Sequence, residues 1–166
     1  REFYELASRR LERGGVMQQW LQLHHTNRRN VATVLGTLPA VFPHVLLAVS
    51  GHQGLLLASE TELVVRRDAL VGLEKVGYVA AALDGGHLVD YAKGIVLDED
   101  GIDAFVKDTA ESASMSVTDF VSTDQNLFLE YATPRGNVPN ADDISDTLKY
   151  LSSYRTRQTL PQHIRL

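Results

Sequence analysis

The sequence contains no cysteine among its 166 residues. A chain without thiols has no disulfide framework, no thiolate nucleophile and no cysteine-based zinc site. An excess of positive charge is also absent, because 16 Lys and Arg stand against 21 Asp and Glu, which gives a net charge of −5. We therefore expect no nucleic-acid partner, since binding nucleic acid through bulk charge normally requires a basic protein.

Long apolar runs are absent as well. The longest candidate, Val41–Leu57, is interrupted by proline, glycine, histidine and glutamine, whereas a membrane span needs about 20 nearly continuous apolar residues. We therefore expect no membrane span, and no secretory signal is visible. The 44% of hydrophobic residues indicates a globular chain, which we expect to be cytoplasmic. Because the sequence starts with Arg1 and enters a helix pattern at once, we also expect a fragment of a longer protein.

Residues 1–64 alternate between helix and strand patterns. Apolar residues three and four positions apart predict two amphipathic helices. Two apolar runs joined by a glycine-bearing turn predict a hairpin, and we expect both of its faces to be covered in a layered α/β sheet. The predicted elements are a helix from Phe3 to Leu11 ended by Gly14-Gly15, a strand over Val16–Leu23, a helix after Asn27 or Asn30 that ends at Pro39, and strands over 44–50 and 55–59.

Residues 65–166 show mostly helical patterns. Caps and glycine stops divide this part into several short segments. The predicted elements are a helix from Arg67 to about Leu83 with a break near Gly77, a short helix over His87–Lys93, a helix capped by Asp98 or Asp100 with Ile102, Phe105 and Val106 on one face, a loop over 109–118, an extended segment over 128–131, a linker over 134–140 and a helix over Asp143–Tyr154.

Several groups of polar residues fit structural roles better than catalytic ones. The acidic clusters at 98–100 and 142–143 precede apolar helix patterns, where carboxylates cap a helix. The adjacent His24 and His25 would point in opposite directions on a strand, and no His-Glu-x-x-His helix is present, so we expect no metal site. Gly14-Gly15 precedes a strand, whereas cofactor-binding glycines follow one.

Three glutamines surround Trp20 in the first predicted strand, namely Gln18, Gln19 and Gln22. A strand of an α/β sheet rarely carries three amides, each with donors and acceptors that need partners. If this strand is parallel, its carboxyl end lies in the crevice where such sheets bind ligands. We therefore expect at least one of these amides in a binding site, and a hydrogen-bonded edge or an interface is the alternative.

Several segments together resemble the spermidine/spermine synthase-like family of polyamine aminopropyltransferases, especially bacterial members whose synthase-like domain follows a membrane-embedded region. Ser122, Gln125 and Leu127 depart from the family pattern. The segments that carry the resemblance are Glu2-Phe3-Tyr4-Glu5-Leu6-Ala7, Gly14-Gly15-Val16, Gln19-Trp20-Leu21, Val41-Phe42-Pro43-His44, Leu55–Ser59, and the stretches Ser122–Asn126 and Leu129–Gly136, which are similar to an Asn-Thr-Asp-Asp…Leu-Glu-Tyr…Pro-Arg segment near the end of such chains.

The resemblance implies a Rossmann-like sheet of the methyltransferase type, with seven strands and a reversed hairpin at its end. On that template Val16–Leu23 is the fifth strand, and the hairpin supplies the sixth and seventh. We therefore predict an α/β protein in which residues 1–64 form the C-terminal half of a synthase-like domain, in the order helix, strand, helix, hairpin. Residues 65–166 are expected to form a mainly helical extension.

The resemblance also implies an activity, the transfer of an aminopropyl group from decarboxylated S-adenosylmethionine, as co-substrate, to a polyamine-type small molecule. In the family, the cofactor loop, the acidic residue at the ribose and the catalytic aspartate all precede the Glu-Phe-Tyr helix. We therefore expect this chain to hold no cofactor and no catalytic residue, and to be inactive alone. A family glutamine at the end of the fifth strand helps hold the amine, and this implies Gln19, Trp20 and Gln22 as candidate substrate-binding residues.

Two other functions stay open. The chain could be a non-catalytic binding or assembly module whose later helices form an oligomer interface. It could also come from an S-adenosylmethionine-dependent methyltransferase with the same half-sheet. We further expect a homo-oligomer, because half a sheet leaves an apolar strand edge that tends to pair with another chain.

Overall fold

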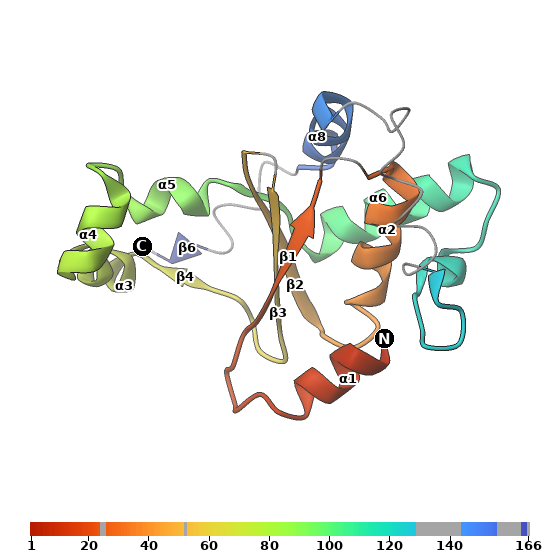
Figure 1. Ribbon diagram of the computed structural model, residues 1–166, viewed down its shortest axis with the longest axis horizontal. Coiled ribbons are helices and arrows are strands. Elements are labelled where there is room, and N and C mark those ends of the chain that lie inside the picture. The colour runs from red at the N-terminus through yellow and green to blue at the C-terminus, as the bar shows by residue number, and fades with distance from the viewer. Residues whose placement is uncertain (24–25, 52, 129–143, 156–163, 166) are drawn as a thin grey trace.

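The computed structural model describes residues 1–23, 26–51, 53–128, 144–155 and 164–165. The fold is α/β, as predicted, with a four-stranded sheet at its centre (Figure 1). Helices gather on one side of this sheet, and a second group of three short helices lies beyond the other side. The first group is α1 (Glu2–Ser8), α2 (Arg28–Thr37), α6 (Glu99–Ser112), the 3-10 helix η1 (Val117–Phe120) and α8 (Ile144–Ser153), and the second is α3 (Arg67–Glu74), α4 (Gly77–Leu83) and α5 (Leu88–Ala92).

The sheet has the strand order β1-β3-β2-β5, and each neighbouring pair is antiparallel. Leu56 of β3 therefore lies opposite Gln19 on one side and Leu47 on the other. The sequence placed a binding crevice at the carboxyl end of the first strand on the condition that this strand is parallel to its neighbour. β1 is instead antiparallel to its neighbour β3, because the second strand of the hairpin lies between β1 and β2. The strands are β1 (Met17–Gln22), β2 (His44–Ser50), β3 (Gln53–Ser59) and β5 (Ile95–Leu97).

One face of the sheet is buried under α2 and α6. Side chains alternate along β1, so Met17, Gln19 and Leu21 share the face toward these helices. Each fully buried leucine or phenylalanine in this core contributes about 1.5–3 kcal/mol relative to exposure. The predicted stripes of α2 and α6 are confirmed as core residues, namely Val31, Val34, Leu35 and Leu38 beside Ile102, Phe105 and Val106. The stripe predicted for the first helix was wrong, because Phe3 and Leu6 are 66% and 56% exposed and Tyr4 is the buried residue of α1.

The opposite face of the sheet is only partly covered. A small buried cluster of Leu46, Leu63 and Ile95 lies there. Ala48 of β2 and Leu57 of β3 pack against this cluster, so both faces of the predicted hairpin are at least partly covered. On β1, however, Trp20 remains 50% exposed. Beyond this face, β4 (Val65–Arg66) pairs in parallel with β6 (Ile164–Arg165) beside the three short helices (Figure 1).

Side-chain caps fix where α2 and α6 begin. The Asn27 side chain accepts a hydrogen bond from the Asn30 amide at 2.9 Å, and the Asp98 side chain accepts one from the Gly101 amide at 2.9 Å. Asn27 and Asp98 are therefore the caps, rather than Asn30 and Asp100. Such caps satisfy backbone amides that have no partner within the helix.

Two local expectations were wrong. The first helix ends at Ser8 and not at Leu11, whose amide is shared between the carbonyls of Ala7 and Ser8 at 3.2 Å each. The expected loop over 109–118 is helical as far as Ser112, because Thr109 and Ala110 are buried in the core. Near the end of the same segment, Ser116 caps the start of the 3-10 helix η1.

The predicted break near Gly77, the short helix after His87 and the final helix are confirmed by α3, α4, α5 and α8. Strand β5 was not predicted. Elements from both predicted domains share one core, since Leu97, Phe105 and Phe120 cluster with Leu21 and Leu56. The predicted extended segment over 128–131 lies almost wholly outside the described residues, as does the linker over 134–140.

Arg28 joins α2 to α6 and α8. Its guanidinium donates to the Thr109 hydroxyl at 2.8 Å, pairs with Asp108 at 2.9 Å and lies 3.9 Å from the centre of the Tyr150 ring. The Tyr154 hydroxyl also donates to Asp108. Hydrogen bonds from Tyr154 and Arg28 lower the pKa of the Asp108 carboxyl. These contacts fasten a late helix onto the first half of the chain.

Two glycines give a matched test of the packing between α2 and η1. A Cβ at Gly36 would lie 2.7 Å from the Phe120 carbonyl oxygen, whereas a Cβ at Gly72 would meet nothing within 4 Å. We expect Gly36→Ala to lower the free energy of unfolding by about 1–3 kcal/mol. Gly72→Ala should raise it by about 0.5–1 kcal/mol. Urea denaturation measures both changes, and equal effects would contradict this account.

Acid should release α8. Because the Asp108 pKa is lowered, its stabilising contribution is complete above the ordinary aspartate pKa of about 3.9 and is lost as the pH falls through the lowered value. We expect the ring resonances of Tyr154 to move toward unstructured positions in that range. In the Asp108→Asn variant the chemical shifts of the Tyr154 ring should already differ from wild type at neutral pH, and they should no longer change when acid is added. A wild-type response that persists in the variant would rule out this cause.

Candidate functional site

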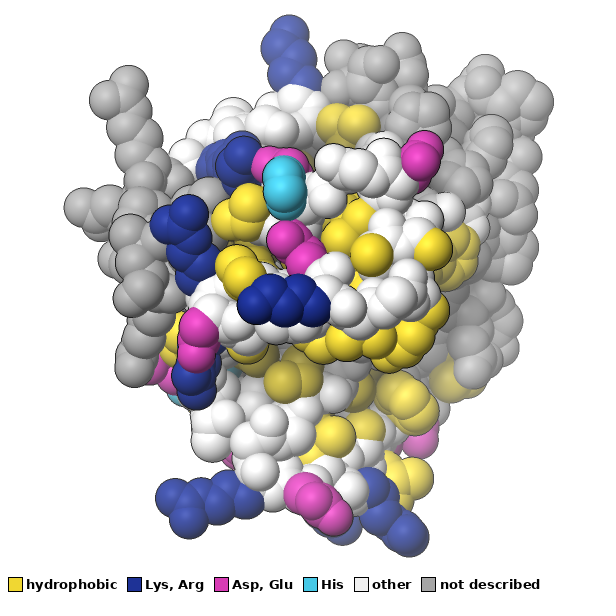
Figure 2. Space-filling model, turned by 90° about the vertical axis from the view of Figure 1, so that its left-hand side faces the viewer, with side chains coloured by type: hydrophobic (Ala, Val, Ile, Leu, Met, Phe, Trp, Pro, Cys, Tyr) yellow, Lys and Arg dark blue, Asp and Glu magenta, His cyan; other side chains and the backbone are white. Residues whose placement is uncertain are grey.

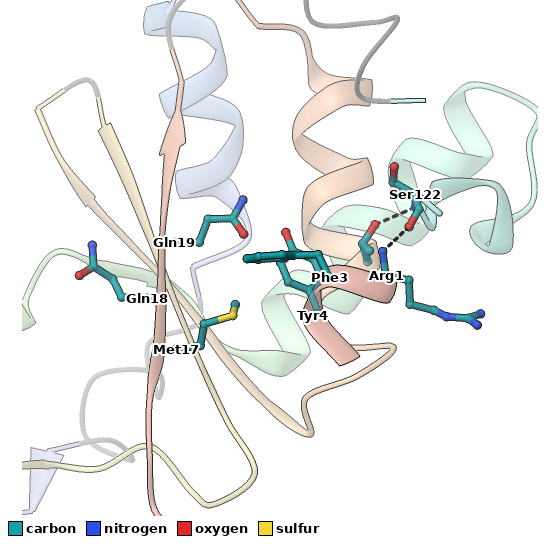
Figure 3. A pocket seen from close by; sticks show the side chains of 8 residues that line it. Arg1, Phe3, Tyr4, Met17, Gln18, Gln19 and Ser122 are labelled. Carbon is teal, nitrogen blue, oxygen red and sulfur yellow. Dashed lines mark hydrogen bonds between the residues drawn. The ribbon is translucent and has the colours of Figure 1, made fainter. Parts of the chain in front are cut away.

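A pocket of about 450 Å³ opens between α1 and β1. The end of α2 and the segment that follows η1 complete its wall (Figure 3). Met17 and Gln19 reach into it from β1, because these positions point toward the helical side of the sheet. The lining residues are Arg1, Phe3, Tyr4, Met17, Gln18, Gln19, Thr37 and Ser122.

Gln19 carries an unsatisfied acceptor in this pocket. Its Oε1 is buried and has no hydrogen-bond partner among the described residues. Gln19 lies close enough to Tyr4, which is only 7% exposed, to affect its hydroxyl. Burial raises the pKa of the Tyr4 hydroxyl, and the hydrogen bond from Gln19 partly opposes that shift. A buried acceptor without a partner is rare and costly, so it indicates a place for a donor.

The pocket suits a hydrogen-bond donor attached to an apolar chain. Gln19 Oε1 can accept an N–H or O–H group, and Phe3 and Met17 supply apolar walls. No Asp or Glu is among the residues that line it. The described part of the chain therefore offers a neutral acceptor, and carboxylates for a polycation would have to come from elsewhere.

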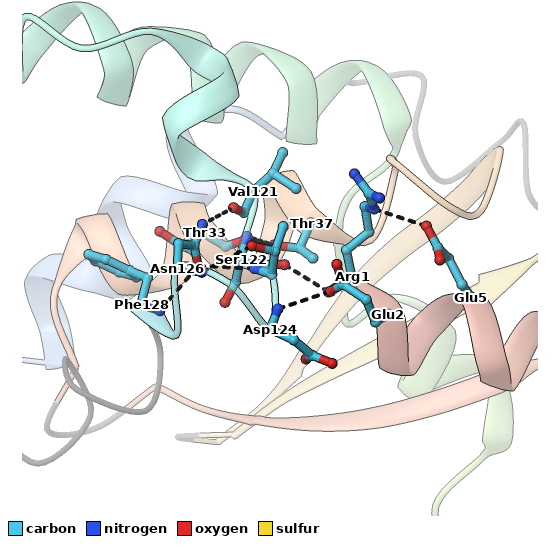
Figure 4. Close-up of polar contacts among 11 residues, drawn as sticks. Arg1, Glu2, Glu5, Thr33, Thr37, Val121, Ser122, Asp124, Asn126 and Phe128 are labelled. Carbon is cyan, nitrogen blue, oxygen red and sulfur yellow. Dashed lines mark hydrogen bonds and ion pairs between the residues drawn. The ribbon is translucent and has the colours of Figure 1, made fainter.

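The wall at Ser122 is held by hydrogen bonds to α1 and α2 (Figure 4). The Ser122 amide donates to the Thr37 hydroxyl at 2.8 Å, and that hydroxyl donates in turn to the Thr33 carbonyl at 2.6 Å. The Asp124 amide donates to Glu2 at 3.1 Å. The stretch Ser122–Asn126, which resembles a family segment, is thereby fixed beside the pocket.

The structure separates the three candidate substrate-binding residues. Gln19 lies in the pocket, whereas Trp20 and Gln22 occupy alternate positions of β1 and so point to the opposite face. Gln18 borders the pocket, but its side chain points away from Gln19 (Figure 3). Sequence reasoning missed Tyr4 as the partner of Gln19, although Tyr4 belongs to the Glu-Phe-Tyr run that carries the resemblance.

The described histidines pair with carboxylates. His44 lies 3.1 Å from Glu99, and His87 lies 3.4 Å from Glu74. Within the described ranges, no group of three or more His, Asp or Glu residues is arranged to hold a metal ion. His24, His25, His52 and His163 lie outside those ranges, as does the acidic pair at 142–143.

Comparison with protein-family models, with curated proteins and with solved structures finds no match. The fold and the pocket are therefore described from the structure of this chain alone. Among the described residues, none of the helices is long and apolar enough to cross a membrane.

A double-mutant cycle tests the pairing of Tyr4 with Gln19. Tyr4→Phe removes the group next to the Gln19 amide and should lower the free energy of unfolding by about 1 kcal/mol. Gln19→Leu also removes the unpartnered Oε1, so its loss should be smaller. The double variant removes both polar groups, so it should be close to wild-type stability or above it. Urea denaturation of the four proteins gives the coupling. Additive losses would show that the two side chains do not interact.

Proposed function

We propose that this chain is the C-terminal part of a spermidine synthase-like aminopropyltransferase, in which Gln19 binds the amine that accepts the aminopropyl group. The observation that carries the proposal is the buried and unpartnered Oε1 of Gln19. The family resemblance implies an amine-holding glutamine on this strand, and an amine nitrogen is the kind of donor that this oxygen lacks. The apolar walls suit the methylene chain between amine groups.

The arrangement of the sheet supports the same proposal. The elements follow the order helix, strand, helix, hairpin, and the second hairpin strand is reversed between its neighbours. Among the described strands β1 is paired with β3 on one edge, and we propose that a larger sheet continues from its other edge. A Rossmann-like sheet with β1 as an inner strand would use that edge.

In the proposed reaction the neutral amine nitrogen attacks the propyl carbon next to the sulfonium. A carbon–nitrogen bond forms, the carbon–sulfur bond breaks with its electrons on sulfur, and a thioether leaves. The attacking nitrogen then loses a proton to a general base. Gln19 contributes by accepting one N–H, which orients the nitrogen lone pair toward the carbon. In this proposal Tyr4 is a positioning residue, whose hydroxyl lies next to the Gln19 amide.

The sulfonium co-substrate and the general base belong, by the resemblance, to segments before the Glu-Phe-Tyr helix. We therefore propose that this part of the protein binds the amine but does not catalyse transfer alone. The cytoplasmic location and the homo-oligomeric state expected from the sequence belong to the same proposal. The alternative of a non-catalytic assembly module is favoured by one observation, the exposed apolar helices α3 and α4.

Titration with putrescine, followed by NMR, tests the proposed amine site. We expect the side-chain amide of Gln19 and the ring of Tyr4 to shift on binding, and Gln19→Leu to weaken binding at least about tenfold, as the loss of one hydrogen bond to a charged or polar donor implies. Gln18→Leu is the matched control and should bind like wild type. With decarboxylated S-adenosylmethionine present, no aminopropyl product should form.

Two outcomes would contradict the proposal. Equal binding by wild type and Gln19→Leu would remove Gln19 from the amine site. Product formation by the 166-residue chain would show that it holds its own cofactor site and base.

A further inference from the structure

The pocket beside Gln19 is built without a negative charge. None of the eight described residues that line it is Asp or Glu, and the ionisable side chains among them are those of Arg1 and Tyr4. The Arg1 guanidinium pairs with Glu5 at 2.9 Å. Gln19 Oε1 is buried without a partner among the described residues, and it is a neutral acceptor. The wall therefore offers a ligand a lone pair but no compensating charge.

The carboxylates of the elements around the pocket lie outside its lining. On α1 they are Glu2, which accepts a hydrogen bond from the Asp124 amide at 3.1 Å, and Glu5, which pairs with Arg1 (Figure 4). The segment after η1 contributes Asp124, which is not among the lining residues. α2 and β1 contain no acidic residue. A cation inside the pocket would thus meet no carboxylate of these elements in its wall.

The charged side chains of the three short helices lie beyond the opposite face of the sheet. Figure 2 looks onto that side of the molecule and shows acidic and basic side chains next to one another. Asp68 pairs there with Arg66 at 2.5 Å, and Asp90 pairs with Lys93 at 2.5 Å. On the pocket side, the arginines of α2 begin that helix, at the end away from Thr37. These groups therefore do not supply a charge to the pocket.

Tyr4 reports how this region treats a charge. Its side chain is buried, and burial raises the pKa of its hydroxyl because the phenolate would lose its solvation. The same loss of solvation lowers the pKa of an amine, since the charged form of an amine is the protonated one. Burying an unpaired charge also costs far more than burying a neutral group that finds a hydrogen-bond partner. The surroundings of Gln19 therefore favour the neutral form of a ligand.

We propose that the Gln19 pocket selects an uncharged hydrogen-bond donor on a short apolar chain, such as the free base of an alkylamine or an alcohol, over a protonated amine. This selectivity rests on the proposed function only in taking an amine as the natural ligand. The N–H or O–H group donates to Gln19 Oε1, and the carbon chain lies against Phe3 and Met17. The second, charged end of a diamine has to stay outside the pocket in water.

Selection of the free base also prepares the amine for transfer. An alkylammonium that binds releases its proton to the solvent, and the neutral nitrogen keeps the lone pair that attacks carbon in the proposed reaction. The pocket thereby carries out part of the activation of the nucleophile through burial alone.

Three small probes separate the effect of charge from that of hydrogen bonding. Butan-1-ol is an uncharged donor, butan-1-amine is protonated at pH 7, and 1-methoxypropane has the same heavy atoms as the alcohol but no donor. NMR titration of the Gln19 side-chain amide gives the three dissociation constants. We expect butan-1-ol to bind at least about tenfold more tightly than either of the other two probes at pH 7.

The pH dependence of amine binding tests the same selectivity. An alkylamine has a pKa near that of lysine, about 10.4, so its free-base fraction rises about tenfold for each pH unit below that value. Between pH 7 and pH 9 the binding of butan-1-amine should therefore strengthen about a hundredfold, whereas that of butan-1-ol should stay constant. Tyr4 remains protonated in this range, because burial raises its pKa above the ordinary value.

Gln19→Glu should reverse the preference. It replaces the amide with a carboxylate of the same size, so butan-1-amine at pH 7 should then bind more tightly than butan-1-ol. Gln53→Glu is the matched control, because it adds the same charge at an exposed position of β3 outside the pocket and should keep the wild-type preference. Circular dichroism verifies the fold of both variants, and the comparison of probes in the wild-type chain needs neither of them.

Four results would each overturn the selectivity. These are binding of butan-1-amine at pH 7 as tight as that of butan-1-ol, amine binding that does not change with pH, equal binding of 1-methoxypropane and butan-1-ol, and no binding of butan-1-ol. Failure of the proposed function gives a different result, in which putrescine binds wild type and Gln19→Leu equally while butan-1-ol still binds wild type more tightly than the variant.

Discussion

The pairing of β3 on both of its edges is the constraint on which the rest of the structure depends. β3 binds β2 through the tight hairpin and β1 through a register that sets Gln19 opposite Leu56. A shift of one residue in that register would turn Gln19 outward and bring Trp20 into the core. The same pairing leaves the far edge of β1 without a described neighbour. Both the pocket and the proposed continuation of the sheet thus follow from the position of one strand.

Gln19 is where stability and function conflict. Met17 and Leu21, on the same face of β1, are apolar, but Gln19 between them brings an acceptor that finds no partner among the described residues. A sequence that departs from the core pattern at one point often does so at a functional site. Arg28 gives the contrast, because its guanidinium has partners on α6, in Thr109 and Asp108, and lies over the Tyr150 ring of α8.

The sequence predicts local features well and distant pairings poorly. The stripes of α2 and α6, one of the two candidate caps at the start of each of these helices, and the hairpin follow from residues close together in the chain, and the structure has them. β5 was missed because three residues, Ile95–Leu97, are too short for a pattern, and their strand depends on pairing with β2. Side chains alternate along a strand, so the sequence predicts that Gln19 and Trp20 point to opposite faces. The proximity of Gln19 to Tyr4 depends on how α1 packs against β1, and residue spacing does not predict that packing.

The proposed continuation of the sheet beyond β1 is the central claim, because the half-sheet depends on it. Amide hydrogen exchange along β1 tests it most directly. In the 166-residue chain, alternate amides that point to β3 should exchange slowly, and those between them should exchange nearly as fast as in an unstructured peptide. Slow exchange at all positions of the strand would mean that the edge is already covered, and would contradict the account.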